Sequence, residues 1–552
     1  MKMSTGKKSF FGVMKSYNKG FWVASIMELF ERWAWYGLFA VLALYLTGST
    51  DEGGLGFSHT EKGQIMGIVT AILYLLPLFT GVIADKIGYK LSLVIAYVLL
   101  ISGYYVMGQV QSYPIVFIVF LWVAIGAAMF KPVASAIVTK NTDETNSTLG
   151  FGIFYMMVNI GGFIGPAFSS TLRTQFGWKL VFLQASIVIA INLVILLLFY
   201  KEKDREKNTE SISEAIKSSV IKIWEAVKDS RLSVLLIIMV GFWTMFNQLF
   251  YTLPTFIEDW VNTKALHDSI AQVSPWVANA MSGGGDSVKP EMLVNLDAGS
   301  IILFQLIVSY FVLRMRHVSA MITGFIVAAI GIGITFYTGN GLYTILGIMI
   351  FAIGEMMTNP TFSSFIALIS PKGKEALYMG TYFLPVFLGN FLTTFVSGNL
   401  YQAWSDKLTL LKGEIASRGL NVKELGEVLS REEFTNKAAN ALNMPVSEVV
   451  DKFIPVNADV SSWNDIIKSI REYAKANEIK LGELGSTFSK NDYFASASEK
   501  LGMTETEMTQ YIWDSYNPNK IWYVIVGIGI VTILALIIYD RMVIRPKEKQ
   551  AK

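Results

Sequence analysis

The chain of 552 residues is 53% hydrophobic and only 16% charged, which is too apolar for a soluble globular protein of this length. It contains no cysteine, and this excludes a disulfide framework, a thiolate nucleophile and a Cys-ligated metal site. The formal net charge of +3 does not indicate nucleic-acid binding, because Lys and Arg gather beside hydrophobic segments rather than along one soluble face.

Twelve apolar blocks follow one another along the chain. Each is long enough for a helix rising 1.5 Å per residue to cross a hydrocarbon core of about 30 Å. The predicted spans are 21–47, 61–84, 88–108, 112–139, 150–173, 178–200, 232–257, 298–314, 319–338, 343–369, 377–402 and 520–540. The pattern therefore predicts an all-α, multi-pass membrane protein.

The distribution of charge outside these blocks predicts the topology. Residues 1–27 contain five lysines and no acidic residue, which favours a cytoplasmic start. Basic residues also occur in the loops around Lys86–Lys90 and Lys372–Lys374 and in the tail after 540, whereas the first loop on the other side holds acidic residues. With twelve spans, we expect both termini to be cytoplasmic and the protein to lie in the inner (plasma) membrane.

A polar stretch at 201–231 separates the first six predicted spans from the other six. This layout is similar to that of major facilitator transporters, which are built from two six-helix bundles. The sequence GVIADKIGYK at 81–90 also resembles that superfamily's loop between its second and third helices, although an ordinary cytoplasmic turn would explain it too. We expect a first bundle at 1–200, a cytoplasmic linker at 201–231, helices 7–11 at 232–402, and helix 12 with a cytoplasmic tail at 520–552.

Residues 403–519 are too polar to span a membrane and too long for an ordinary loop. Compared with itself at an offset of 59 residues, the segment pairs identical residues without a gap, such as Trp404 with Trp463 and Leu442 with Leu501. Apolar residues recur at helical spacing, so we predict a tandem duplication of a small helical unit. The predicted topology makes it an extracytoplasmic insert between helices 11 and 12. It could dock another envelope protein or be a passive packed appendage.

A few charged residues lie inside the apolar blocks. Glu28, Glu31 and Arg32 have the i, i+3, i+4 spacing of one helical face, while Lys131 and Glu355 lie in the fourth and tenth blocks. Charges near the bilayer centre cost about 3 kcal/mol on insertion scales, so those that persist usually line a water-filled pathway and pair with one another. Such a site can bind a zwitterion and change its pairing when a carboxylate takes up a proton. The alternatives are an ion pair that only fixes packing and a Lys131 that snorkels to the interface.

Several motifs resemble those of the proton-coupled oligopeptide transporters (POT/PTR family), and they occur in both halves of the chain. The first span resembles the ExxERFxYYG signature and the fifth resembles FYxxINxG, while the fourth and tenth resemble the family's Lys-Pro and GExxxSP patterns. The matching residues are Glu28, Glu31, Arg32, Tyr36 and Gly37, then Lys131 and Pro132, then Phe154, Tyr155, Asn159 and Gly161, and then Gly354, Glu355 and Pro360. The duplicated segment lies outside this resemblance.

The resemblance implies a proton-coupled symporter that imports di- and tripeptides by alternating access. Arg32 and Lys131, assisted by Tyr36, would receive the peptide carboxylate, and Glu355 with Asn159 would receive the amino group. Glu28 and Glu31 would carry the coupled proton, releasing Arg32 or Lys131 from ion pairs when protonated. The substrate-binding residues implied in full are Arg32, Tyr36, Lys131, Tyr155, Asn159, Gln248 and Glu355.

The chain also departs from the family pattern. Asn247, followed by Gln248, stands where the seventh helix usually carries an acid, so a common protonation partner is missing. Trp33 and Trp35 replace a Phe and a Tyr of the first signature, and Asn359 stands in place of Ser. Asp297 could take the place of the family's amide on the eighth helix and donate an extra acid to the site, or it could be an interfacial cap.

Other interpretations remain open. The chain could be a facilitator-type carrier for another zwitterion, a peptide-like drug or an organic anion, or a peptide-sensing receptor in which the duplicated segment reports occupancy. No phosphate-binding Gly-Lys-Ser/Thr loop or nucleophile elbow is present, so we expect neither an enzyme nor a cofactor. His59, His267 and His317 are far apart and are interpreted as surface residues, not metal ligands. The expected partners are small peptides, protons and membrane lipid.

Overall fold

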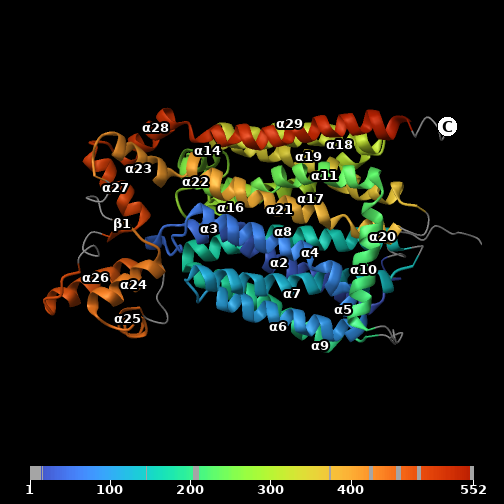
Figure 1. The fold of residues 1–552 in the computed structure, drawn as a ribbon, viewed down its shortest axis with the longest axis horizontal. Helices are drawn as coiled ribbons and strands as arrows, with labels where there is room; N and C mark the ends of the chain where they lie inside the picture. The colour runs from blue at the N-terminus through green and yellow to red at the C-terminus, as the bar shows by residue number, and fades with distance from the viewer. Residues whose placement is uncertain are drawn as a thin grey trace, which may run out of the picture.

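The computed structural model describes residues 14, 16–143, 146–202, 211–371, 375–421, 427–454, 462–481 and 487–546. Long helices run side by side along the molecule, and a group of short helices lies at one end (Figure 1). We call this the module end and the other the opposite end, where α10 (Ile212–Val227) lies. The lysines predicted to mark the cytoplasmic side at 1–13 and at Lys372–Lys374 lie outside the described residues, as do the duplicated segments at 422–426 and 482–486.

The first half of the bundle ends before α10. It consists of α2 (Lys19–Thr47), α3 (His59–Gly63), α4 (Val69–Leu75), α5 (Pro77–Ile87), α6 (Tyr89–Met107), α7 (Tyr113–Lys140), α8 (Ser147–Phe176) and α9 (Trp178–Phe199). A π-helical segment at Gln64–Ile68 joins α3 to α4, and the chain bends by 47° before α5. Pro77 begins α5 and cannot donate a backbone hydrogen bond, which accounts for the break at this position.

The second half follows α10. It consists of α11 (Ser230–Phe246), α12 (Gln248–Tyr251), α13 (Leu253–Trp260), α14 (Thr263–Val273), α15 (Pro275–Ser282), α16 (Pro290–Val294), α17 (Leu296–Val312), α18 (His317–Tyr337), α19 (Gly341–Ile369), α20 (Glu375–Gly380), α21 (Phe383–Thr394), the π-helical η3 (Phe395–Leu400), α22 (Tyr401–Trp404) and α29 (Ile521–Tyr539). The seventh predicted span is thus divided into α11, α12 and α13.

Within the described ranges, ten helices are long and apolar enough to cross a membrane, or eleven if the bent pair from His59 to Ile87 is one span. The molecule is therefore an all-helical, multi-pass membrane protein. The helix α2 is 29 residues long but is not among these, since Glu28, Glu31 and Arg32 make its first half polar. The expected total of twelve spans remains a prediction.

Small residues bring α2 and α8 into close contact. A Cβ atom added at Gly161 would lie 2.9 Å from the Cβ of Arg32, and one added at Gly165 would lie 2.7 Å from the backbone nitrogen of Gly37. Real Cβ atoms do not approach this closely, so the packing requires glycine, as is common where membrane helices meet. The contact fixes the charged face of α2 beside α8.

The two halves also pack directly on each other. The helix α3 lies against η3, and α4 lies against α21. A Cβ atom at Gly63 would lie 2.7 Å from the Cα of Gly398, so here too the backbones meet without intervening side chains. The helix α13 of the second half also packs on α2.

The short helices at the module end repeat at the offset seen in the sequence. Those of the first unit are α23 (Lys407–Ser417), α24 (Arg431–Leu442) and α25 (Val446–Phe453), and those of the second are α26 (Ser462–Ala476), α27 (Lys490–Lys500) and α28 (Glu505–Tyr516). The strands β1 (Glu427–Val428) and β2 (Thr487–Phe488) pair in parallel.

The two units exchange their first helices. The apolar side chains of α23 pack in one core with those of α27 and α28, which is continuous with the core of the second half. The apolar side chains of α26 pack instead with α24 and α25 in a separate core. The apolar core of the second half therefore extends into the duplicated segment through α23, α27 and α28, while α24 and α26 contact the first half near Thr50.

Candidate functional site

A cavity of about 330 Å³ lies between the two halves of the bundle. We call it the central cavity. It brings together five of the residues predicted to bind substrate, which are Tyr36, Lys131, Tyr155, Asn159 and Glu355. They come from α2, α7, α8 and α19, so residues more than 300 positions apart in the sequence share one cavity.

The positively charged pole of the central cavity is Lys131. Its Nζ atom lies 4.3 Å from the centre of the Tyr74 ring, whose face attracts a cation and holds the ammonium group in place. Both residues line the cavity, from α7 and α4 of the first half. No ion pair between Lys131 and a carboxylate is present in the described part of the chain, so its charge is available to an anionic group in the cavity.

Glu28, Glu31 and Arg32 form a buried cluster beside the cavity and are not among its lining residues. Arg32 Nε lies 3.3 Å from Glu28 Oε1, and the guanidinium also pairs with Glu31. The three residues share one helical face, as their spacing predicts. The guanidinium carbon of Arg32 lies 5.9 Å from the centre of the Tyr36 ring, which does line the cavity. Tyr36 therefore adjoins both the cluster and the cavity.

The negatively charged pole lies in the second half and contains two carboxyl groups. Asp297 near the start of α17 and Glu355 in α19 both line the cavity and are in hydrogen-bonding contact with each other. Their side chains are nearly fully buried. Asp297 therefore lies in the cavity wall, which is the position expected if it adds an acid to the site.

Between the two poles the cavity wall is mainly aromatic. The residues that supply these rings include Trp35, Phe39, Trp243, Phe246, Phe250 and Tyr382. Tyr382 donates a hydrogen bond of 2.6 Å to Asn359 Oδ1, so the residue that replaces the family's Ser orients a wall residue. Asn247 also lines the cavity, and its Nδ2 has no hydrogen-bond partner among the described residues.

Gln248 is placed differently from the other predicted substrate-binding residues. It is fully buried, and it does not belong to the lining of the central cavity. Its Nε2 donates to the backbone oxygen of Thr244 at 2.8 Å, and its Oε1 accepts from Thr252 Oγ1 at 2.6 Å. These bonds satisfy polar groups on both sides of the break between α11 and α13.

Some lining residues were missed by sequence reasoning. Asn295 lies two positions before Asp297, and its Nδ2 donates to the backbone oxygen of Phe163 at 2.9 Å. Its Oδ1 has no donor in the part of the chain that the structure describes. Tyr74 and Trp243 belong to ordinary aromatic positions in apolar blocks. The sequence offered one signal, which would have identified Asn295: it is a polar residue close to Asp297, whose own role was open.

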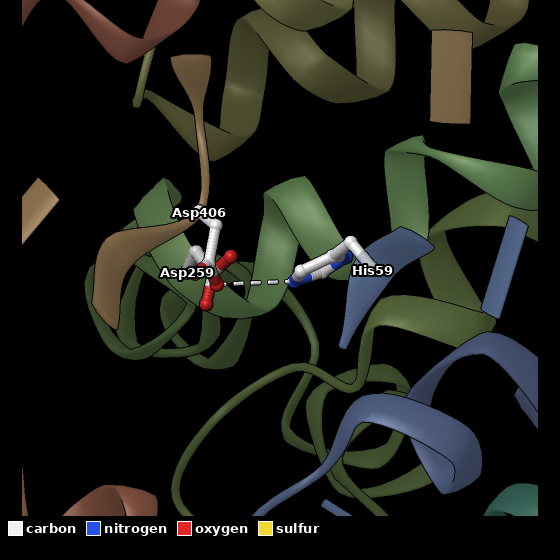
Figure 2. A group of neighbouring side chains, drawn as sticks. All are labelled: His59, Asp259 and Asp406. Carbon is white, nitrogen blue, oxygen red and sulfur yellow. Dashed lines mark ion pairs between the residues drawn. The ribbon is translucent and has the colours of Figure 1, made fainter. Parts of the chain in front are cut away.

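A second polar group lies between the two halves at the module end. Figure 2 shows His59 of α3 beside Asp406, with Asp259 of α13 next to them; His59 Nε2 lies 3.2 Å from Asp406 Oδ1. Asp406 is also the N-cap of α23 and accepts a hydrogen bond from the backbone of Thr409. The interpretation of His59 as a surface residue is wrong, because the ring is covered by Tyr401 and is 4% exposed.

The ligand atoms of His59, Asp259 and Asp406 lie within 4.8 Å of one another, a spacing that a metal ion could use. Two lysines, the buried Lys62 and the half-buried Lys490, however, already balance the two carboxylates electrostatically. Lys62 Nζ donates to the backbone oxygen of Tyr251 at 2.9 Å, and Lys490 Nζ donates to that of Thr47 at 2.7 Å. A divalent cation would leave this group with excess positive charge in a buried place, so we assign no metal to it.

These charged residues border a further cavity of about 500 Å³ at the module end, to which Asp259, Asp406 and Lys490 all contribute. Burial and the neighbouring Asp406 raise the pKa of Asp259 to about 7, although Tyr401 donates a hydrogen bond of 2.7 Å to its carboxylate. Arg173 of α8 and the buried Glu291 of α16 form another ion pair across the halves, at 3.2 Å. We refer to these contacts together as the module-end seam.

Comparison with known proteins agrees with this architecture. The sequence profile of the Major Facilitator Superfamily matches residues 24–284. The chain is 28% identical over 204 residues to the uncharacterized transporter YclF of Bacillus subtilis, and 28% identical over 186 residues to dipeptide and tripeptide permease B of Aliivibrio fischeri. These alignments cover 36% and 33% of this chain, and only 40% and 36% of the lengths of the two relatives.

The structural similarity covers more of the chain than the sequence alignments do. A crystal structure of a peptide transporter POT in complex with sulfate superposes with a TM-score of 0.59 at 18% identity, covering 71% of this chain and 90% of that one. Identity this low shows a shared fold alone. The profile match makes residues 24–284 similar to the Major Facilitator Superfamily, and the chain's distant relatives include di- and tripeptide transporters.

Proposed function

We propose that the chain is a proton-coupled symporter that imports di- and tripeptides across the inner membrane by alternating access, with both termini in the cytoplasm. One observation carries the proposal: the central cavity has Lys131 on the wall of the first half and Glu355 with Asp297 on the wall of the second. A short peptide is a zwitterion, so its carboxylate and ammonium groups can bind both walls at once. Binding then links the two halves that must move relative to each other.

The shape and lining of the cavity support this substrate class. Its volume of about 330 Å³ falls within the common range for small-ligand sites, about 300 to 1,000 Å³. Fixed charged poles select the ends of a peptide, while aromatic walls accept side chains of different shape without specific hydrogen bonds. That relatives are named as dipeptide and tripeptide permeases supports the same class.

Glu28, Glu31 and Arg32 supply the proton coupling in this proposal. Their ion pairs hold the guanidinium away from the cavity while both carboxylates are ionised. Protonation of Glu31 or Glu28 removes one negative charge from the cluster and frees Arg32 to act, together with Tyr36, on a substrate carboxylate. Deprotonation on the cytoplasmic side restores the pairing and releases the substrate.

The test is uptake of labelled dialanine into vesicles that contain the purified full chain, with and without a gradient that is acidic outside. We expect Lys131→Gln to abolish gradient-driven uptake. Lys140→Gln is the matched control, because Lys140 lies on the same helix and its Nζ is 4.2 Å from the Tyr89 ring, outside the central cavity. Equal uptake by the two variants would contradict the proposal.

Asn247 favours a second candidate, a facilitator-type carrier for another zwitterion or a peptide-like drug. This residue lines the cavity without a titratable group where related peptide transporters are expected to carry an acid. Such a carrier would equilibrate its substrate and would not accumulate it. Competition of dialanine uptake by a panel of amino acids, peptides and peptide-like drugs, with the proton gradient collapsed, would separate the two candidates.

A further inference from the structure

Asp297 and Glu355 lie side by side in the wall of the central cavity, 4% and 9% exposed. Each carboxyl group is within hydrogen-bonding contact of the other. One oxygen of each, Asp297 Oδ1 and Glu355 Oε2, has no hydrogen-bond donor among the described residues. Two buried acceptor groups are therefore in contact, and this contact requires a hydrogen atom that no other described residue supplies.

The charged and titratable neighbours of the pair do not neutralise it. The phenol groups of Tyr36 on α2, Tyr155 on α8 and Tyr382 before α21 lie near Glu355. In the described ranges neither Asp297 nor Glu355 forms an ion pair with a lysine or arginine. Lys131 on α7 interacts electrostatically with Arg32, Glu31 and Glu28 rather than with this pair. The negative charge of the pair is therefore not balanced by a lysine or arginine in the described ranges.

Two carboxylates in contact in a buried site cannot both stay ionised, because their repulsion adds to the cost of removing each from water. One shared proton removes the repulsion and provides the missing hydrogen bond, as in enzymes that hold two carboxyl groups together. The monoprotonated pair keeps a single negative charge, which can reside on either residue.

We propose that Asp297 and Glu355 hold one proton between them, so that the negatively charged pole of the central cavity keeps a single charge for the substrate's primary ammonium group. The two carboxyl groups line the same cavity and contact each other. The assignment rests on the proposed function for its ligand and adds a shared, titratable proton to the site.

The shared proton has a consequence for charge balance. One ammonium group neutralises the single negative charge of the pair, so the loaded pole can be enclosed between the two halves without burying a net charge. If both carboxyl groups were ionised, the loaded pole would retain a negative charge and closure would be costly. The pair thus places a titratable group in the second half, where Asn247 provides none.

The first test is dialanine binding to the purified full chain in nanodiscs. Because either residue can carry the charge, Asp297→Asn and Glu355→Gln should each weaken binding by about tenfold or less, whereas the double variant should weaken it by about 100-fold or more. Asp297→Glu should restore near-normal binding. If Glu355→Gln alone lost as much as the double variant while Asp297→Asn bound normally, the pair would be disproved.

The second test detects the shared proton directly by infrared spectroscopy. Infrared difference spectra of the unliganded chain across a pH titration should contain the C=O stretching band of a protonated carboxyl group that is lost in both Asp297→Asn and Glu355→Gln. Glu28→Gln, which removes a different buried carboxyl group, should retain this band. A band that persists in Asp297→Asn overturns the inference even where the protein transports peptides. Loss of the band in a protein that ignores peptides would reject the proposed substrate instead.

Discussion

Lys490 Nζ donates a hydrogen bond of 2.7 Å to the backbone oxygen of Thr47, the last residue of α2. A second bond of 3.2 Å reaches the backbone oxygen of Phe57 in the following loop. Lys490 begins α27, whose apolar side chains belong to the core of the second half, whereas Thr47 and Phe57 belong to the first half. The duplicated segment therefore contributes a contact that joins the two halves at the module end.

Removing this contact should shift the molecule toward a conformation open at the module end. Hydrogen bonds made by a charged group contribute about 1.5 to 3 kcal/mol, so Lys490→Met should change the closed-to-open ratio by about tenfold or more. The chain contains no natural cysteine, so a single Leu44→Cys substitution reports access to the module-end cavity without background. We expect faster labelling by a water-soluble maleimide in Lys490→Met.

Lys500→Met is the matched control for this experiment. Lys500 ends the same helix and is exposed, so its replacement should leave labelling of Leu44→Cys unchanged. Equal labelling of the Lys490 and Lys500 variants would mean that the duplicated segment only rests on the bundle. Deletion of 404–518 would then preserve transport, as expected for a passive appendage.

Asp259 should make the module-end seam sensitive to pH. Its pKa is about 7 in the closed seam, raised by burial and by Asp406, whereas a solvated aspartate has a pKa of about 3.9. Between about pH 4 and pH 7 the closed seam keeps a proton that an open, hydrated seam would release. Low pH therefore favours closure, and this contribution is lost as the pH rises through about 7, by up to tenfold per pH unit within the window.

The measurement is the rate of Leu44→Cys labelling at successive pH values, corrected for the pH dependence of the reagent with a free thiol. Labelling should accelerate between pH 5 and pH 8 in the parent protein and stay nearly constant in Asp259→Asn. Glu258→Gln is the control, because Glu258 borders the same cavity but is exposed. A parent profile that is reproduced by Asp259→Asn would assign the titration to another group.

The poles of the central cavity could be predicted from the sequence, because a charged residue inside an apolar block has few physical reasons to be there. Lys131 and Glu355 stood out in this way, and both line the cavity. Asn247 and Gln248 could not be separated by the same reasoning. They are adjacent in a block where the helix breaks, and only the three-dimensional position of the break decides that Asn247 faces the cavity while Gln248 does not.

The module-end seam illustrates what sequence reasoning could not reach. His59, Asp259 and Asp406 come from three segments, each near the end of an apolar block, where charged residues are ordinarily solvated. The burial of His59 and Asp406, with Asp259 half-buried beside them, depends on the contact between α3 and η3 and on the duplicated segment. The sequence repeat likewise predicted two similar units but not the exchange of α23 and α26 between them, because both arrangements bury the same side chains.

Glu31 provides the sharpest test of the proton cycle. Its side chain is fully buried against Arg32, and Glu31→Gln would leave the guanidinium with the more distant contact to Glu28, at 3.3 Å. Losing one partner of a buried ion pair costs about 3 to 5 kcal/mol. Glutamine takes up no proton, so Arg32 would no longer be held and released in step with protonation at position 31. We expect gradient-driven uptake of dialanine to fall about 100-fold or more, while counterflow exchange of labelled for unlabelled dialanine persists, since exchange needs no net proton movement.

Glu225→Gln in the exposed linker helix α10 should behave as the parent protein in both assays. A Glu31→Gln protein that retained the parent's dependence of uptake on external pH would reject this residue as the proton carrier, because an amide cannot titrate in its place.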